Sequence, residues 1–172
     1  MLCITDSIYK ALDCGNDVAM IFLDISKAFD RVWHKGLLFK LKCLGVGGSF
    51  FAWIDDYLSK RNQRVVLNGQ ESTIMCTNAG VPQGSILGPF LFIIFMNDIE
   101  ETITSDMYIF ADDTTLTKTY DLLSEAESCL NGDLNTISQW ATKWMVNFNM
   151  EKTVSISFSL KTKHVNFPKI FV

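Results

Sequence analysis

The feature that most constrains this chain is a pair of apolar runs that each end in aspartate. Residues 18–23 precede Asp24, and residues 107–111 precede Asp112 and Asp113. Short apolar runs of this kind are typical of buried strands, which here would carry carboxylates to their C-terminal ends. Carboxylates so distant in sequence meet only if the two strands are neighbours, and a cation must then offset their repulsion and desolvation. Hard oxygen ligands suit Mg²⁺ or Mn²⁺, and the layout is typical of two-metal phosphoryl transfer.

The same aspartates also have a purely structural interpretation. Asp24 could cap a helix that begins near Ser26, and Asp112-Asp113 could form an ordinary hairpin turn. Tight hairpin turns favour Asn-Gly or Asp-Gly, because their central residues need positive φ angles. No glycine is present at this turn. A local rule that is broken at the end of a strand favours a functional role over a simple turn.

A third element is the loop of residues 79–89, which contains two prolines and three glycines. Such a loop can bring its backbone close to a ligand. It leads into the apolar run 90–96, which we expect to be a helix that is buried on most faces. Gln83 and Ser85 lie near the N-terminus of that helix, where free N–H groups and the helix dipole favour phosphate. The loop could equally be a turn into a core helix, since a glycine-rich loop alone is a weak signal.

The remaining pattern predicts one mixed domain. Asn68-Gly69, between two apolar segments, is the strongest short hairpin signal in the chain. A long amphipathic stripe over residues 121–145 predicts a helix or a helix pair that faces the core, although a partner-binding face has the same pattern. Strands mixed with helices that pack on one face of a sheet give an α+β class. Helices are expected at 5–12, 35–44, 50–58, 90–96 and 121–145, and strands at 18–23, 63–67, 71–76, 107–111, 114–118 and 154–158.

Taken together, these motifs resemble those of reverse transcriptases. Residues 22–30, 80–85 and 110–113 are similar to motifs A, B and C of that family, and residues 149–153 resemble its motif D. The motifs stand in the order that the family uses. The resemblance covers about residues 6–158, and four motifs in sequence are far more specific than any one alone.

The residues around motifs A and B resemble the non-LTR (LINE-type, jockey-like) retrotransposons of animals, as residues 30–34 and 86–89 illustrate. The resemblance implies a polymerase palm, in which a ferredoxin-like antiparallel sheet is backed by helices. It also implies an RNA-directed DNA polymerase that adds deoxynucleotides to a primer 3′-hydroxyl. An intron-encoded or telomerase-type reverse transcriptase is the alternative enzyme. The non-enzymatic alternative is a catalytically silent fragment derived from a retrotransposon.

The resemblance implies a role for each residue of the acidic cluster. Asp24 and Asp112 would bridge two Mg²⁺ ions, with Mn²⁺ as an alternative, and Asp113 would complete the cluster. The backbone carbonyl of Ile25 would be an additional metal ligand, and Ile25 would also contact the nucleotide. Lys152 would act as general acid to the pyrophosphate, or would simply neutralise its charge.

The nucleotide would be held by residues of motifs A and B. Phe29 matches the family's steric gate, where a ring under the sugar would clash with a 2′-hydroxyl. The alternative for Phe29 is an ordinary core aromatic. Gln83 and Gly84 match the loop that lines the nucleotide pocket and touches the template. Asp30 is expected to cap a helix or to form a salt bridge with a nearby cation.

Composition excludes several classes of protein. The 172 residues are 48% apolar and 12% aromatic, which fits one globular domain over 1–172 rather than a disordered chain. The longest uncharged apolar stretch, 86–96, is far shorter than the ~20 residues that span a bilayer. Residues 1–13 show no signal-peptide pattern. The five cysteines are scattered without a Cys-x-x-Cys pair, which predicts reduced core thiols in an intracellular protein, nuclear by family.

The net charge of −4 argues against tight binding of nucleic acid by this chain alone, because phosphate contacts need Lys or Arg. We interpret the chain as the acidic catalytic part of a larger enzyme. By resemblance, it holds the palm with part of the fingers, while most of the fingers, the thumb and an endonuclease domain are missing. The expected partners are an RNA template, a DNA primer and deoxynucleoside triphosphates. The fragment alone is expected to be inactive.

Overall fold

The computed structural model describes residues 2–59 and 61–161, and the chain forms two compact units. The first unit contains residues 1–26, 99–143 and 147–172. The second unit contains residues 27–98 and 144–146. Helices and antiparallel strands occur together, which confirms the predicted α+β class.

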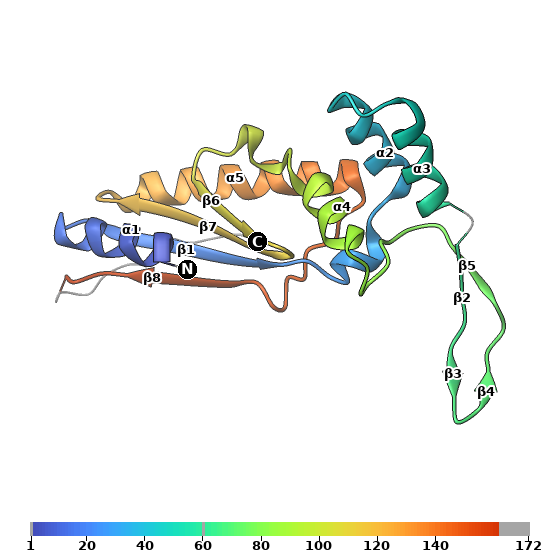
Figure 1. The fold of residues 1–172 in the computed structure, drawn as a ribbon. Helices are drawn as coiled ribbons and strands as arrows, with labels where there is room; N and C mark the ends of the chain where they lie inside the picture. Colours follow the sequence, from blue (N-terminus) through green and yellow to red (C-terminus); the bar gives the residue numbers. More distant parts are fainter. Residues whose placement is uncertain (1, 60, 162–172) are drawn as a thin grey trace. The chain divides into compact units, whose positions relative to one another are not determined.

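The first unit is built on a four-stranded sheet with the strand order β6-β7-β1-β8 (Figure 1). All neighbours in this sheet are antiparallel. The longest ladder joins β1 to β7 and runs from Asp17, opposite Tyr120, to Asp24, opposite Asp113. The elements of this unit are α1 (Leu2–Asp13), β1 (Asp17–Asp24), the 3-10 helix η2 (Ile99–Thr102), β6 (Asp106–Phe110), β7 (Asp113–Tyr120), α5 (Leu123–Trp144) and β8 (Val154–Phe158).

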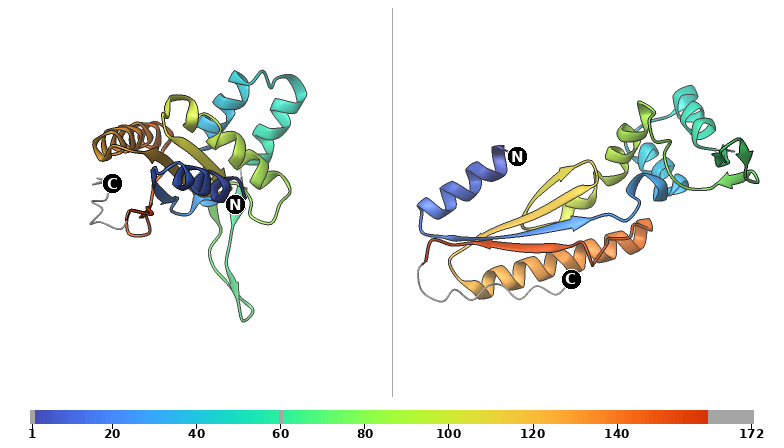
Figure 2. Two further views of the ribbon diagram at one scale, coloured as in Figure 1. Left: turned by 90° about the vertical axis from the view of Figure 1, so that its left-hand side faces the viewer. Right: turned by 90° about the horizontal axis from the view of Figure 1, so that it is seen from below.

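Helices α1 and α5 lie on opposite sides of this sheet (Figure 2). Val18 and Met20 of β1 are buried in a cluster with Ala11 of α1. The alternate residues Ala19 and Ile21 are fully buried as well. The prediction that helices cover one sheet face was therefore wrong. The physical reason is that residues 18–21 are apolar on both faces, so each face needs a cover.

The cover on the α1 side ends before the C-terminal end of β1. Phe22, two residues beyond Met20, is already 38% exposed, and Asp24 follows on the same face because alternate strand residues share a face. Across the sheet, Val154 and Ile156 of β8 pair with Phe22 and Met20 and are exposed too. The C-terminal end of β1 thus presents an open sheet face.

The second unit contains several helices and an exposed hairpin. Helix α2 packs against α3 and α4, and α4 also contacts η1. The prediction that residues 90–96 form a helix buried on most faces is confirmed, since only Phe90 and Ile93, which share one face, are more than half exposed. The elements are the 3-10 helix η1 (Ala28–Arg31), α2 (His34–Cys43), α3 (Gly48–Leu58) and α4 (Leu87–Met96).

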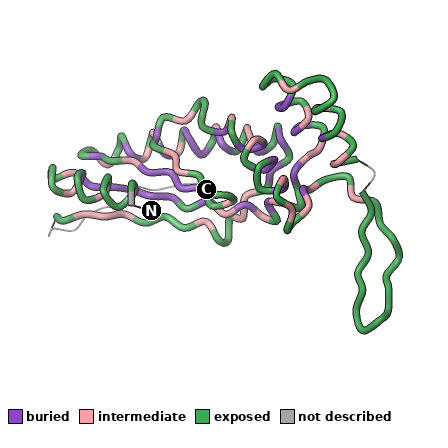
Figure 3. Tube along the Cα trace, viewed as in Figure 1, coloured by how far each residue is buried: buried purple, intermediate pink, exposed green. Residues whose placement is uncertain are grey.

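A long two-stranded hairpin follows α3 and is exposed along its length (Figures 1 and 3). Asn68 and Gly69 form its tip with φ angles of 50° and 75°, which confirms the predicted turn. The ladder is interrupted, because Gln63 pairs with Met75 whereas Val66 pairs with Glu71. The register therefore shifts by one residue, as in a β-bulge. Its strands are β2 (Arg61–Gln63), β3 (Val66–Leu67), β4 (Gln70–Glu71) and β5 (Met75–Thr77).

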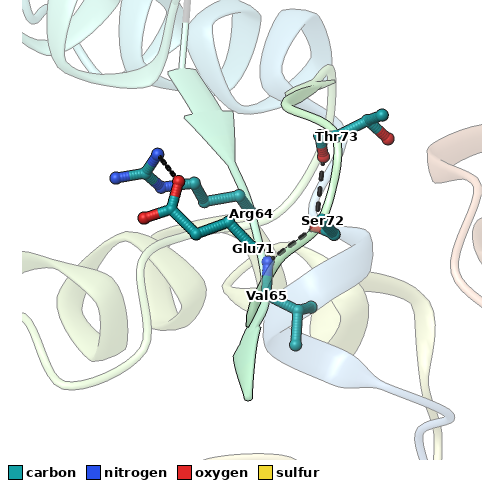
Figure 4. Close-up of polar contacts among 5 residues, drawn as sticks. All are labelled: Arg64, Val65, Glu71, Ser72 and Thr73. Atoms are coloured by element: carbon teal, nitrogen blue, oxygen red, sulfur yellow. Dashed lines mark hydrogen bonds and ion pairs between the residues drawn. The ribbon is translucent and has the colours of Figure 1, made fainter. Parts of the chain in front are cut away.

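Polar contacts hold the interrupted part of this hairpin together (Figure 4). Arg64 forms an ion pair with Glu71 across the bulge. The backbone N–H of Val65 donates to the Ser72 hydroxyl at 2.9 Å, and that hydroxyl donates to the Thr73 carbonyl at 3.1 Å. These contacts supplement the backbone bond from the Ser72 N–H to the Val65 carbonyl, at 2.9 Å, where the register changes.

The prediction of buried core thiols was wrong. All five cysteines are unpaired thiols, and only Cys129 is partly buried. Cys3 and Cys43 lie in the end turns of α1 and α2, Cys14 follows α1, and Cys76 is in the exposed hairpin. A cysteine at the end of an element has no core to enter. Within the described part of the chain, no helix is both long enough and apolar enough to cross a membrane.

Candidate functional site

The predicted acidic cluster lies at one end of the two central strands of the four-stranded sheet. Asp24 ends β1 and is directly opposite Asp113, the first residue of β7. Directly opposed residues of an antiparallel pair point to the same face. Asp112 occupies the two-residue turn between β6 and β7. The sequence had indicated that the strand before Asp112, which is β6, lies beside β1. The neighbour of β1 is instead β7, because the tight turn after β6 folds the chain back and places β7 between β6 and β1.

The turn that carries Asp112 is strained. Ala111 has a φ of 54°, in the left-handed region that glycine normally occupies. A non-glycine residue there costs about 1–2 kcal/mol. The strand that follows is strongly buried, with Thr114 at 1% and Leu116 at 0% exposure. Packing of β7 therefore holds the turn in place, and strain of this kind clusters at functional sites.

The carboxylates are accessible but do not form a closed ligand set. The Asp24 side chain is 33% exposed, Asp112 is partly buried and Asp113 is exposed. Among residues 2–59 and 61–161, no three His, Cys, Asp or Glu side chains are arranged to hold a metal ion. The donor chemistry fits a hard divalent cation, since every donor is a carboxylate oxygen. The shared metal site remains a prediction.

The segment before β8 runs alongside the end of β1. The Ser26 N–H donates to the Asn147 carbonyl at 2.8 Å, and the Asn149 N–H donates to the Asp24 carbonyl at 2.7 Å. Ile25 thereby bridges Phe148, and the bonds of this bridge do not use the Ile25 carbonyl.

Lys152 reaches the acidic cluster of Asp24, Asp112 and Asp113 from the same segment. Its Nζ lies 3.7 Å from Asp24 Oδ2, and its side chain is 68% exposed. The structure thus brings Lys152, Asp24 and Asp113 to the same end of the central strands, with Asp112 in the adjoining turn.

Of the residues predicted to bind the nucleotide, Ile25 belongs to the first unit, whereas Phe29, Gln83 and Gly84 belong to the second. Phe29 of η1 is partly buried, and its ring centre lies 4.8 Å from that of Phe92 in α4. This contact supports the core-aromatic alternative, and the gate role of Phe29 stays a prediction. Gln83 is exposed, and its Nε2 donates to Asp30 Oδ1 at 2.8 Å. The structure therefore pairs Asp30 with Gln83 instead of a nearby cation, and the N-cap of η1 is Lys27 and not Asp30. Gly84 is exposed, with a φ of 77°.

The glycine-rich loop is fastened to η1 through Gly80. Its N–H donates to the Val32 carbonyl at 2.9 Å, and the next N–H, of Val81, donates to the Phe29 carbonyl at 2.7 Å. His34 Nε2 lies 2.6 Å from the Gly80 carbonyl. A Cβ on Gly80 would lie 2.7 Å from the Asp30 carbonyl oxygen, and the φ of 91° also demands glycine. Sequence reasoning missed His34, although it stands among the residues that resemble non-LTR elements.

Ser85 has a structural role at the start of α4. Its hydroxyl accepts a bond from the Gly88 N–H at 3.0 Å and donates to the Pro82 carbonyl at 2.7 Å. The hydroxyl thus satisfies one of the free N–H groups of the first helical turn. This supports the simple-turn alternative for Ser85.

Buried charges were also missed. Lys40 is 6% exposed, lies 3.9 Å from the Trp144 ring centre, and donates to the Asp98 carboxylate at 2.5 Å. Asp133 is 3% exposed and accepts bonds from Thr104 and Ser105. Burial acts to raise the pKa of Asp133, but these hydrogen bonds outweigh it and the pKa lies below its ordinary value. The available signal was position, since each charge stands on the apolar face of its predicted helix.

Comparison with known sequences decides the family. Residues 4–168 match the family described as "Reverse transcriptase (RNA-dependent DNA polymerase)". The chain belongs to this family. The matched range contains every residue of the acidic cluster and of the glycine-rich loop.

The relatives of this reverse transcriptase chain are proteins of mobile elements. It is 41% identical over 150 residues to the RNA-directed DNA polymerase from mobile element jockey of Drosophila melanogaster, covering 82% of this chain and 16% of that protein. It is 32% identical over 167 residues to the probable RNA-directed DNA polymerase from transposon BS of the same species, covering 92% and 18%. The predicted kinship with jockey-like non-LTR retrotransposons is confirmed. The reverse transcriptase chain spans less than a fifth of the length of these relatives.

Solved structures support the fold of this reverse transcriptase chain. A Candida tropicalis telomerase, solved in complex with a TWJ fragment of telomeric RNA, has a TM-score of 0.63 at 13% identity, covering 91% of this chain and 29% of that one. The corresponding Candida albicans structure has a TM-score of 0.51 at 14% identity, covering 96% and 31%. At such identities the likeness shows the fold alone, whereas the sequence relatives favour the retrotransposon over the telomerase-type alternative.

Proposed function

We propose that this chain is the palm, with part of the fingers, of an RNA-directed DNA polymerase from a non-LTR retrotransposon. The observation that carries the proposal is the placement of Asp24 directly opposite Asp113, with Asp112 in the adjoining turn, in a chain of this family. The strand order β6-β7-β1-β8, with α5 between β7 and β8, supports a ferredoxin-like palm. The reaction is attack of a primer 3′-hydroxyl on the α-phosphate of a deoxynucleotide, with pyrophosphate leaving.

Three carboxylates and one carbonyl would hold the divalent ions. Asp24, Asp112, Asp113 and the Ile25 carbonyl would together hold two Mg²⁺ ions, or Mn²⁺. When bound, such ions make the attacking hydroxyl more acidic and stabilise the charge on the leaving oxygens. The chain fixes the backbone of Asp24 from both sides, through β7 and through Asn149. That rigidity keeps the reacting groups aligned, and a misplacement of about 1 Å can cost on the order of 10²-fold in rate.

The other proposed roles concern the leaving group and the nucleotide. Lys152 neutralises the pyrophosphate or gives it a proton, which its place beside Asp24 supports. Phe29 would act as a steric gate against a 2′-hydroxyl while its other side packs on Phe92. Gln83 and Gly84 would line the nucleotide pocket and touch the RNA template.

The chain is proposed to work as part of a longer enzyme. Its net charge of −4 offers little attraction for a primer–template, because each phosphate contact needs Lys or Arg. Regions of the polymerase outside these residues would supply the basic surfaces of the fingers and thumb. The alternative is a catalytically silent fragment, which the same experiment tests.

The test is primer extension on an RNA template by the full-length polymerase that carries this chain. Asp113→Asn should abolish Mg²⁺-dependent extension, because the site loses one negative ligand, and should leave the fold intact. Asp121→Asn is the matched control, since that exposed carboxylate lies beyond the opposite end of β7. Extension at the normal rate by Asp113→Asn would refute the metal assignment. A wild-type protein without any templated extension would favour the silent fragment.

A further inference from the structure

We propose that Asn149 is a positioning residue that sets Lys152 against Asp24. The inference rests on the polymerase function proposed above and assigns a role to a residue that does not itself touch the reacting atoms. Asn149 lies between the two functional groups in the hydrogen-bond network. Its backbone N–H is bonded to Asp24. Its backbone carbonyl and its side-chain oxygen are bonded to the turn that carries Lys152.

The backbone of Asn149 joins two segments. Its N–H donates to the Asp24 carbonyl at 2.7 Å. Its carbonyl accepts from the N–H of Lys152 at 3.2 Å, from the N–H of Thr153 at 3.0 Å and from the Thr153 hydroxyl at 2.9 Å. Three donors on one carbonyl fix the start of the turn relative to the end of β1. The position of the Lys152 backbone therefore follows from that of Asp24.

The side chain of Asn149 closes the turn. Its Oδ1 accepts from the Glu151 N–H at 3.1 Å, which is the i to i+2 bond of an Asx turn. Lys152 is the next residue, and its Nζ lies 3.7 Å from Asp24 Oδ2. An ion pair with a side chain that is 68% exposed is weak and mobile. The direction in which Lys152 leaves the backbone must then come from the turn rather than from the ion pair.

A purely structural role for Asn149 is the competing explanation, because the same turn leads into β8 at Val154. The two explanations differ in what happens when Lys152 is absent. A positioning residue has no effect once the residue it positions is gone. A residue that only supports the fold lowers activity by the same factor in either background.

The experiment is a double-mutant cycle on the full-length polymerase, with primer-extension kinetics and thermal unfolding as readouts. Asn149→Ala should lower kcat about tenfold with the KM for nucleotide unchanged, because losing the Asx bond lets the turn move. In a Lys152→Met background, the same substitution should change kcat by less than about twofold. Asn149→Asp keeps the acceptor oxygen and should restore most of the rate. Asn135→Ala, on the exposed side of α5, is the matched control and should behave as wild type.

Each outcome has one meaning. Equal losses in both backgrounds, or a wild-type rate for Asn149→Ala, would overturn the positioning role. A wild-type rate for Lys152→Met would remove the role of Lys152 and this inference with it, while the carboxylate assignment would stand. If Asp113→Asn extends the primer at the normal rate, the metal assignment fails independently of Asn149, and if the wild-type protein shows no templated extension, the proposed function itself fails.

Discussion

Two hairpins of this chain have two-residue turns, and they satisfy opposite rules. The hairpin that ends at Asn68-Gly69 has the preferred turn residues, but its strands are short, interrupted and exposed. The hairpin that turns at Ala111-Asp112 has a residue forced to positive φ, but it continues into β7, which is paired on both sides. Turn chemistry specifies a hairpin where packing is absent. Where packing is strong, the turn can be strained and its residues are free to serve function.

The largest expected effect concerns what anchors the strained hairpin. Asp133 of α5 accepts bonds from Thr104 and Ser105, immediately before β6. Asp133→Ala should lower the free energy of unfolding by about 3 kcal/mol, because buried donors lose their acceptor. Urea unfolding followed by circular dichroism measures the loss. A loss below about 1 kcal/mol would show that β7 packing alone holds the hairpin.

The protein should become less stable in acid, because two buried carboxyl groups have lowered pKa values. The pKa of Asp133 and that of Asp17 both lie below the ordinary value. For Asp17, burial opposes this shift, and bonds from Ser159 and Lys161 outweigh burial. A lowered folded-state pKa contributes stability above the unfolded pKa, and this is lost as the pH falls through the folded pKa. Thermal unfolding midpoints measured from pH 6 to about pH 2 should therefore decrease once the pH is below about 4. Asp133→Asn should make that decrease smaller.

A smaller effect of opposite sign is expected at the strained turn. Ala111→Gly should raise the free energy of unfolding by about 1 kcal/mol, because glycine adopts positive φ without a Cβ penalty. If the strain also orients Asp112, primer extension should become slower although the protein is more stable. Faster extension, or lower stability, would contradict the view that the strain is kept for function.

The smallest global effect is expected at the exposed hairpin. Gly69 has a φ of 75°, and Gly69→Ala strains the tip although nothing within 4 Å would meet the new Cβ. Global stability should change by less than about 0.5 kcal/mol, because the hairpin can open without the core. Amide hydrogen exchange should be faster only in β3 and β4. A global loss above about 1 kcal/mol would show that this hairpin is part of the cooperative fold.

The sequence predicted the strands and the turns well for physical reasons that are local. Apolar runs marked β1 and β6, and Asn68-Gly69 marked the exposed tip. The stripe on α5 was also predictable, since Leu130, Leu134 and Ile137 are buried at helical spacing. These signals arise from side-chain period and backbone preference, which a chain carries before it folds.

The sequence predicted that the strand ends that carry aspartate meet, but it did not predict the order of the strands or their register. The position of β7 between β6 and β1 depends on register, and so does the meeting of Asp24 with Asp113. The need for glycine at position 80 depends on the approach of the Asp30 backbone, 50 residues earlier in the chain. The burial of Lys40 depends on Trp144, which comes from another helix.

The sequence by itself determined the family, the strand ends that carry aspartate and the order of the motifs. Only the tertiary structure decided that Ala111 is strained, that Asn149 ties Asp24 to the turn of Lys152, and that Asp133 is buried. The reason is that motifs record which chemical groups are present, whereas the bonds among those groups form only when distant segments pack against one another.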